Sequence, residues 1–213
     1  MNTESTQSRI LSTSAEHLRR VGVIKLRVTA IAEELGMTHA NVYRYYPSKL
    51  ALAEAVISQW LKSVEVSLLE TSGAPDPADD KLERMLNQLA YGYRSKLEED
   101  PKLFDVFAEA ADKDRVIARR HRTRVRELLE RVLSEGMESH IFAPSDMSKT
   151  NLFKNAERSK IVAFVFDSAY RFIHPVAIRL DRNAPPQNLN QRRELIIAML
   201  VRSLVHMKSS QKS

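Results

Sequence analysis

Two glycines and a proline divide the first fifty residues into short helical segments, and this spacing most restricts how the chain can fold. Apolar residues recur at helical intervals from Arg9, and Gly22 lies where a C-terminal helix cap is expected. A second periodic segment runs from Val28 to Gly36. A third ends before Pro47, because the residue preceding a proline is pushed out of the α region. The spacing predicts three short helices, the last two joined by a turn of about three or four residues, as in a helix-turn-helix motif.

The remainder of the chain continues in helical patterns. Ser48 is placed to cap a longer fourth helix, whose apolar positions run through Trp60 to Val64. Only 5 Gly and 7% aromatic residues argue against an all-β fold. After a break at 71–80, further helices are predicted over 82–98, from Pro101, over 115–137, over 160–173 and over 191–207, with breaks at 142–151 and 182–190. We predict an all-α chain with a helix-turn-helix domain at residues 1–47 and a helical domain at residues 48–213.

Composition and motifs exclude several classes of function. The chain of 213 residues has no Cys, which excludes disulfides, cysteine nucleophiles and cysteine zinc sites. The 6 His show no metal-ligand spacing, and no Gly-rich phosphate loop, G-x-S-x-G or H-E-x-x-H pattern occurs, so we predict no cofactor, no metal and no enzyme. The polar N-terminus has no signal-peptide pattern. The longest apolar runs, 161–166 and 195–201, are much shorter than the about 20 residues a bilayer needs, so we expect a cytoplasmic protein.

The stretch GMTHANVYRYYPSK, residues 36–49, is the strongest functional signal. At about 100° per residue, Val42 and Tyr46 share the face toward the first two helices, while Ala40 and Arg44 lie opposite. The net charge of +6 and the pI of about 9.6 suit a nucleic-acid partner, although many basic proteins bind none. We interpret the third helix as a recognition helix for a DNA major groove.

The residue types on the outward face match base and phosphate recognition. Arg44 can offer a bidentate fork to guanine, Asn41 can read adenine, and Ala40 can approach a thymine methyl. Tyrosine hydroxyls and the N–H groups at helix starts suit phosphate oxygens. Alternatively, these tyrosines are ordinary surface residues with half-buried rings and the arginine only stacks on them. The predicted DNA-contacting residues are Thr38, His39, Ala40, Asn41, Tyr43, Arg44, Tyr45, Ser48 and Lys49.

The segment GMTHANVYRYYPSKLALAEAV resembles the signature of the TetR family of bacterial transcriptional regulators, and the resemblance covers roughly residues 8–57. Tyr46 stands where the family usually has Phe, and Leu26-Arg27 replaces the usual Thr/Ser pair. A phosphate contact would therefore come from Arg27, with Thr29. The resemblance implies a homodimer with one helix-turn-helix per subunit. It also implies a helical C-terminal domain that binds a small-molecule effector and thereby releases a palindromic DNA operator.

The C-terminal two thirds supply independent expectations. Ile161–Ile173 and Leu195–Val205 are apolar nearly all round, which indicates a homodimer interface of four helices, unless both are ordinary core helices. The segment 113–131 carries 8 basic residues against Asp114, Glu127 and Glu130, which fits either a solvated face or a pocket for an acidic ligand. Candidate effector contacts, each also explicable as plain core, are Tyr91, Tyr93, Phe104, Phe107, Phe164, Tyr170 and His174.

Three functional hypotheses remain at this point. The first is a dimeric, ligand-responsive repressor that binds a palindromic operator. The second is an architectural protein that binds DNA through the same basic charge without sequence preference, so that Arg44 would matter no more than Lys49. The third, an enzyme, lacks any supporting motif.

Overall fold

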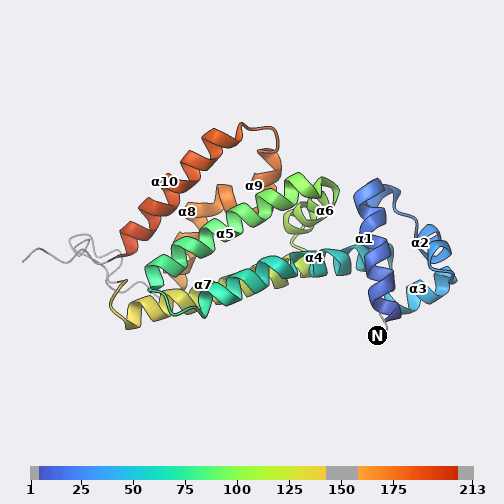
Figure 1. The fold of residues 1–213 in the computed structure, drawn as a ribbon, viewed down its shortest axis with the longest axis horizontal. Coiled ribbons are helices and arrows are strands. Elements are labelled where there is room, and N and C mark those ends of the chain that lie inside the picture. Colours follow the sequence, from blue (N-terminus) through green and yellow to red (C-terminus); the bar gives the residue numbers. More distant parts are fainter. Residues whose placement is uncertain (1–4, 143–157, 206–213) are drawn as a thin grey trace, which may run out of the picture. The chain divides into compact units, whose positions relative to one another are not determined.

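The computed structural model describes residues 5–142 and 158–205, and within these ranges the chain is built of α-helices without a β-strand. The one extended pairing in the described part is an isolated bridge between Phe142 and Val205. The predicted all-α fold is therefore confirmed. In chain order the helices are α1 (Thr6–Lys25), α2 (Val28–Glu34), α3 (His39–Tyr45), α4 (Lys49–Ser72), α5 (Ala78–Glu99), α6 (Pro101–Asp112), α7 (Val116–Glu138), α8 (Arg158–Ile173), α9 (Pro175–Leu180) and α10 (Pro186–Leu204) (Figure 1).

The chain forms two compact units. Among the described residues, the first unit contains residues 5–63 together with Arg94–His121, and the second contains Val64–Tyr93, 122–142 and 158–205. Helices α4, α5 and α7 each contribute one part to each unit. The first unit therefore combines α1, α2, α3 and α6 with one part each of α4, α5 and α7.

In the first unit, α1 buries a stripe that faces its neighbours, including Ile10 and Leu18 at 0% exposure. Gly22 has φ 72° and ψ 171°, values that glycine adopts without steric cost. The sequence predicts that the helix ends here; the regular helical conformation is interrupted at Gly22 as predicted, and a last helical stretch beyond the kink extends α1 to Lys25. Next to α4, the rings of Phe104 and Phe107 from α6 lie edge-on to the Trp60 ring, with centroid distances of 6.4 and 6.5 Å. The core of this unit is thus aliphatic under α1 and aromatic under α6.

In the second unit, the core includes Leu82 and Met85 of α5 together with Leu129 and Leu133 of α7, all at 0% exposure. Lys81 is also buried, because its ammonium group is paired: it donates to the two carboxylate oxygens of Glu135 at 2.5 and 2.6 Å and to the Ala74 carbonyl at 3.1 Å. This cation therefore joins α5, α7 and the loop before α5.

Two helices of the second unit differ from the sequence-based expectation. Helix α9 was not predicted, and α10 begins at Pro186, inside the predicted break 182–190. Both helices begin with proline as their first residue. Proline is tolerated there, because the first N–H groups of a helix have no partner within the helix. Pro186, which lies in the predicted break, thus begins a helix, as Pro175 does. Most of the predicted break at 142–151 lies outside the described residues.

The segment Lys160–Leu180 is long and apolar enough to cross a membrane by length and composition, which the uninterrupted apolar runs did not suggest. It is not one continuous helix, because His174 adopts an extended conformation between α8 and α9. Of its most apolar stretch, 39% is buried inside the fold. The core helix of a soluble protein meets the same criterion, so this segment gives no membrane assignment.

Candidate nucleic-acid interface

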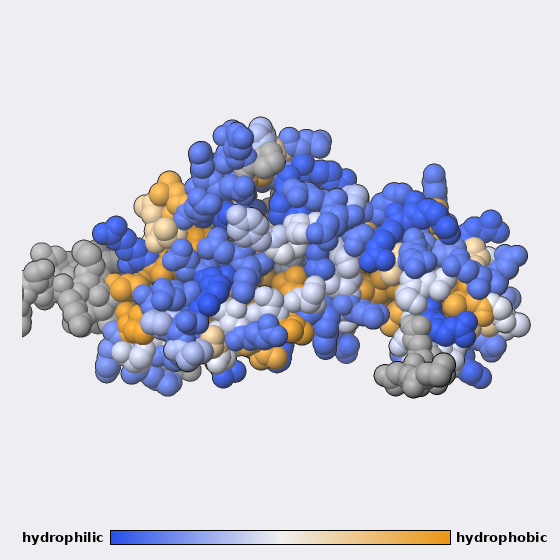
Figure 2. All heavy atoms as spheres, in the orientation of Figure 1, coloured by the Kyte–Doolittle hydropathy of each residue, from blue (hydrophilic) through white to orange (hydrophobic). Residues whose placement is uncertain are grey.

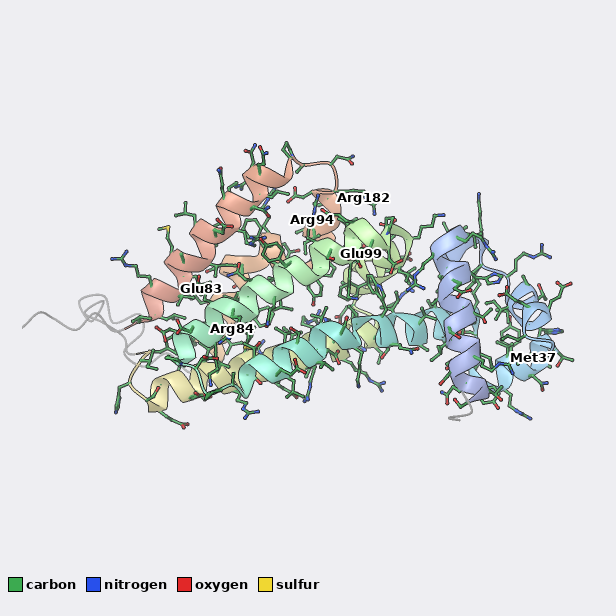
Figure 3. All side chains as sticks on the ribbon, in the orientation of Figure 1. Met37, Glu83, Arg84, Arg94, Glu99 and Arg182 are labelled. Atoms are coloured by element: carbon green, nitrogen blue, oxygen red, sulfur yellow. The ribbon has the colours of Figure 1, made fainter. Side chains whose placement is uncertain are left out.

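The turn between α2 and α3 has the geometry of a Schellman motif. Gly36 has φ 65°, its N–H donates to the Glu33 carbonyl at 3.1 Å, and the Met37 N–H donates to the Ala32 carbonyl at 2.9 Å. Figure 3 labels Met37, which lies in this turn. Thr38 then caps α3, because its Oγ1 accepts from the Asn41 N–H at 3.3 Å. The predicted stop at Gly36 and cap at Thr38 are confirmed, and together they set the direction in which α3 leaves α2.

Helix α3 separates its side chains into an inner and an outer face. Val42 is fully buried, and Tyr46, the C-cap residue, is 7% exposed. Ala40 and Arg44 are exposed on the opposite side, as the helical wheel predicts, and Tyr43 is 41% exposed. The inner residues thus fix α3 on the first unit, while the outer ones face solvent.

The outer side chains make only weak contacts with one another. The rings of His39 and Tyr43 meet edge-on with centroids 6.2 Å apart, and the Arg44 guanidinium lies 5.5 Å from the centre of the half-buried Tyr45 ring. Among the described residues, no carboxylate lies within ion-pair distance of Arg44. Because it is exposed and unpaired there, this guanidinium can reach a base edge without first breaking a salt bridge.

The predicted DNA-contacting residues on either side of α3 are exposed, except for Lys49, whose side chain makes a hydrogen bond within the fold. Ser48 caps α4 by accepting from the Ala51 N–H at 2.9 Å, as predicted. Arg27 and Thr29, at the start of α2, are both exposed, and Arg27 makes no side-chain capping bond. Lys49, predicted to contact phosphate, donates from Nζ to the Ile24 carbonyl at 2.8 Å in the absence of DNA. In this structure it ties the end of α1 to the start of α4.

The predicted effector contacts fall into two sets. Phe104 and Phe107 are buried in the first unit, where Phe107 also meets His121 edge-on. The other five belong to the second unit, so no single compact unit contains all seven. Within the second unit, the rings of Tyr170 and His174 stack with centroids 4.4 Å apart. Burial raises the pKa of Tyr93, and the neighbouring Glu65 carboxylate raises it further, so the phenol stays protonated.

A residue that the sequence reasoning missed is Arg193 of α10. Its side chain is 5% exposed, and its guanidinium lies 3.9 Å from the centre of the Tyr91 ring, whose residue is 53% exposed. Nη1 donates to Asn190 at 3.1 Å, and the Glu194 carboxylate lies 3.4 Å from Nη2. The signal was present: Arg193 precedes the buried Ile197 by four residues and so lies on the inward stripe of α10.

The basic segment 113–131 is largely neutralised by its own neighbours. Arg119 pairs with Asp114 at 3.1 Å, and Arg126 pairs with Glu130 at 3.0 Å. Lys113, Arg115 and Arg124 also have carboxylate partners within 4.0 Å. These pairs favour the solvated face over a pocket for an acidic ligand. No cluster of His, Asp and Glu suited to a metal ion occurs among the residues that the structure describes.

Comparisons with known proteins agree with this geometry. Residues 10–56 match the family described as bacterial regulatory proteins, tetR family, and residues 78–188, about half of the chain, match the tetracyclin repressor-like C-terminal domain. No curated protein sequence matches the chain.

Many solved structures share the fold. SmeT, the repressor of a multidrug efflux pump of Stenotrophomonas maltophilia, is 14% identical with a TM-score of 0.64, and the match covers 98% of this chain and 94% of SmeT. A TetR/AcrR family regulator from Thermobifida fusca is 17% identical with a TM-score of 0.61, covering 92% and 96%. RolR in complex with resorcinol is 17% identical with a TM-score of 0.61, covering 95% and 88%. Because family models match residues 10–56, which contain the capped helix-turn-helix described above, and residues 78–188, the chain belongs to the TetR family of bacterial transcriptional regulators.

Proposed function

We propose that this regulator is a repressor that binds a palindromic DNA operator as a homodimer and is released from it by a small-molecule effector. The observation that carries the DNA-binding half is the outer face of α3, where Arg44 is exposed and unpaired among the described residues while Val42 is buried beneath it. A buried inner face makes the orientation of the outer one definite, which sequence-specific contacts require. The regulator acts in the cytoplasm, where its DNA lies, and without catalysing a reaction.

The homodimer is proposed to form through α8 and α10. Leu195 and Met199, one turn apart on α10, are 61% and 63% exposed, and Tyr170 of α8 is 48% exposed. Hydrophobic residues also gather over α10 on the face shown in Figure 2. Apolar side chains at such exposure favour burial against a second copy. Two-fold symmetry would place two recognition helices about 34 Å apart or a multiple of that distance, which is the reason to expect a palindrome.

The dimer is tested by introducing a charge on this face. Met199→Glu should shift the protein from dimer to monomer in analytical ultracentrifugation, because a carboxylate would be buried without a partner. Val116→Glu is the matched control, since Val116 is a comparably exposed apolar residue, at 48%, on α7. If both variants remain dimeric, the dimer interface does not include this face of α10.

The effector half of the proposal draws on a solved structure of the same fold. RolR is described in complex with resorcinol, which shows that a regulator of this fold accepts a small aromatic molecule. In this chain we propose the second-unit residues Tyr91, Tyr93, Phe164 and His174 as effector contacts. Tyr170 is assigned to the proposed dimer face, while Phe104 and Phe107, which belong to the first unit, stay predictions.

Selection of bound duplexes from a random DNA pool at two salt concentrations tests the DNA-binding half. A palindromic motif that persists at the higher salt would support a specific dimeric regulator, whereas binding that only falls steeply with salt indicates the architectural alternative. Arg44→Ala should cost about 1–3 kcal/mol on the selected duplex and relax the preference at one symmetric base pair. Arg131→Ala removes the same charge from an exposed position on α7 and should leave the base preference unchanged. An unaltered preference in the Arg44 variant would show that Arg44 touches only the DNA backbone.

A further inference from the structure

Asp100, the residue directly before α6, connects three helices of the first unit through one carboxylate. Its Oδ1 accepts from Nε of Arg19 on α1 at 2.8 Å, and its Oδ2 accepts from Nε1 of Trp60 on α4 at 3.0 Å. The Asp100 side chain is only 15% exposed. Both oxygens are therefore occupied by partners that lie 81 and 40 residues away in the sequence.

The surroundings strengthen this junction. Lys96, on the last turns of α5, holds its ammonium group 4.4 Å from the centre of the Trp60 ring. Burial lowers the pKa of Lys96, which the nearby carboxylates of Glu99 and Asp100 oppose. Lys102 of α6 donates from Nζ to the Arg20 carbonyl, two residues before the kink at Gly22. Helix α1 is thus attached to the start of α6 through both a side chain and a backbone carbonyl.

The same turn of α1 holds α2. His17 is buried, and its Nε2 lies 2.7 Å from the Glu34 carboxylate at the end of α2. His17 and Arg19 are two residues apart, so α1 links the junction at Asp100 to the helix that precedes the recognition helix. A shift of α1 at Arg19 would be passed to α2, and from there through the Gly36 turn to α3.

We propose that Asp100 is a positioning residue for operator recognition: it holds α1 against α4 so that α3 is presented in the geometry that reads base edges. The proposal rests on the proposed DNA-binding function. It assigns a role in that function to a residue outside the helix-turn-helix and without contact to its outer face. It also makes Trp60, the only tryptophan of the chain, an internal reporter, because its indole N–H is one of the two donors to the carboxylate.

The test uses the full chain with Asp100→Asn, which keeps the shape and removes the charge, and Arg19→Gln, which removes the α1 partner. Arg19 is 46% exposed at its side chain, so this second variant leaves the core intact. Asp112→Asn, at the exposed end of α6, is the matched control. Each variant is measured for affinity to the selected operator duplex, for affinity to a scrambled duplex, and for Trp60 emission.

We expect both Asp100→Asn and Arg19→Gln to weaken operator binding by about tenfold or more and to weaken binding to the scrambled duplex much less, because base contacts need an accurately placed α3 while charge attraction to phosphate tolerates a small displacement. Trp60 emission should shift in Asp100→Asn and not in Asp112→Asn. Equal loss on both duplexes in Arg19→Gln would mean that Arg19 touches phosphate. Wild-type operator affinity in both variants, despite a shifted Trp60 emission, would overturn the proposal and leave Asp100 a purely structural residue.

The failure of the proposed function would give a different pattern. If the wild-type protein prefers no duplex, DNA recognition itself fails, and the junction is judged by hydrogen exchange. Faster exchange of α3 amides in Asp100→Asn than in Asp112→Asn would then still support a positioning role for Asp100. Equal exchange in the two variants would refute it.

Discussion

Tyr46 contains a buried hydroxyl group that the fold does not use. Its residue is 7% exposed, and within the described residues its Oη has no hydrogen-bond partner. A buried polar group without a partner costs about 1–3 kcal/mol, since it has lost its hydrogen bonds to water. Tyr46→Phe removes this group and keeps the ring that fills the space under α3. We expect the variant to be more stable than the wild type.

The magnitude follows from what the substitution leaves in place. The ring and its apolar contacts are unchanged, so no transfer or cavity penalty offsets the gain. A gain of about 1 kcal/mol in the free energy of unfolding is expected, equivalent to a rise in Tm of about 2–4 °C for a chain of this length. Operator affinity should stay at the wild-type level, because Tyr46 lies on the inner face.

Urea denaturation at one fixed protein concentration measures the effect, since the stability of a dimer depends on concentration. Tyr43→Phe is the matched control: it removes the same atom from a residue that is 41% exposed, and its stability should change by less than about 0.5 kcal/mol. If Tyr46→Phe instead lowers the free energy of unfolding by about 1 kcal/mol, the reasoning is refuted. Such a loss would mean that the hydroxyl group is hydrogen-bonded to water in the folded protein.

Two further substitutions test the second unit. Gly136→Ala should lower the free energy of unfolding by about 1–2 kcal/mol: a Cβ there would lie 2.0 Å from Cδ2 of Phe142, and displacing that ring outweighs the higher helix propensity of alanine. Urea denaturation with Gly73→Ala as control measures it, since the nearest atom there is 3.6 Å away. Glu135→Gln should cost about 1–3 kcal/mol by leaving the buried Lys81 ammonium without its counter-ion, and adding Lys81→Met in the same chain should recover most of the loss.

The helix-turn-helix was predictable because its signals are local. Gly36 with positive φ, the side-chain cap at Thr38 and the proline after Tyr46 each act within a few residues, so the sequence alone states where α3 begins and ends. The inward direction of Val42 follows from the helical period once these limits are known. What the outer side chains bind does not follow from such signals, and the DNA contacts stay predictions.

Polar and charged residues on buried stripes were missed for a different reason. Lys81, Arg193 and His17 were passed over as polar, yet each is buried because a specific partner accompanies it: the Glu135 carboxylate, the Tyr91 ring and the Glu34 carboxylate. In all three pairs, the partner comes from another helix. Helical periodicity contains no information about partners on other helices. An argument from periodicity therefore assigns every polar or charged residue to the solvent-exposed face.

The boundary of the N-terminal domain is a second feature that depends on contacts between helices distant in the sequence. The predicted boundary after residue 47 follows the end of the motif, where the local pattern changes. The first compact unit also contains residues 94–121, because α6 packs against α1 and the Asp100 carboxylate accepts from Arg19. Such a contact closes a loop of about eighty residues whose entropic cost grows only slowly with length, so sequence distance is no guide to which helices form one body. We therefore expect a substitution in α6 to lower operator affinity more than a substitution in residues 64–72 of α4. Those residues are nearer to the helix-turn-helix in sequence, but they belong to the second unit.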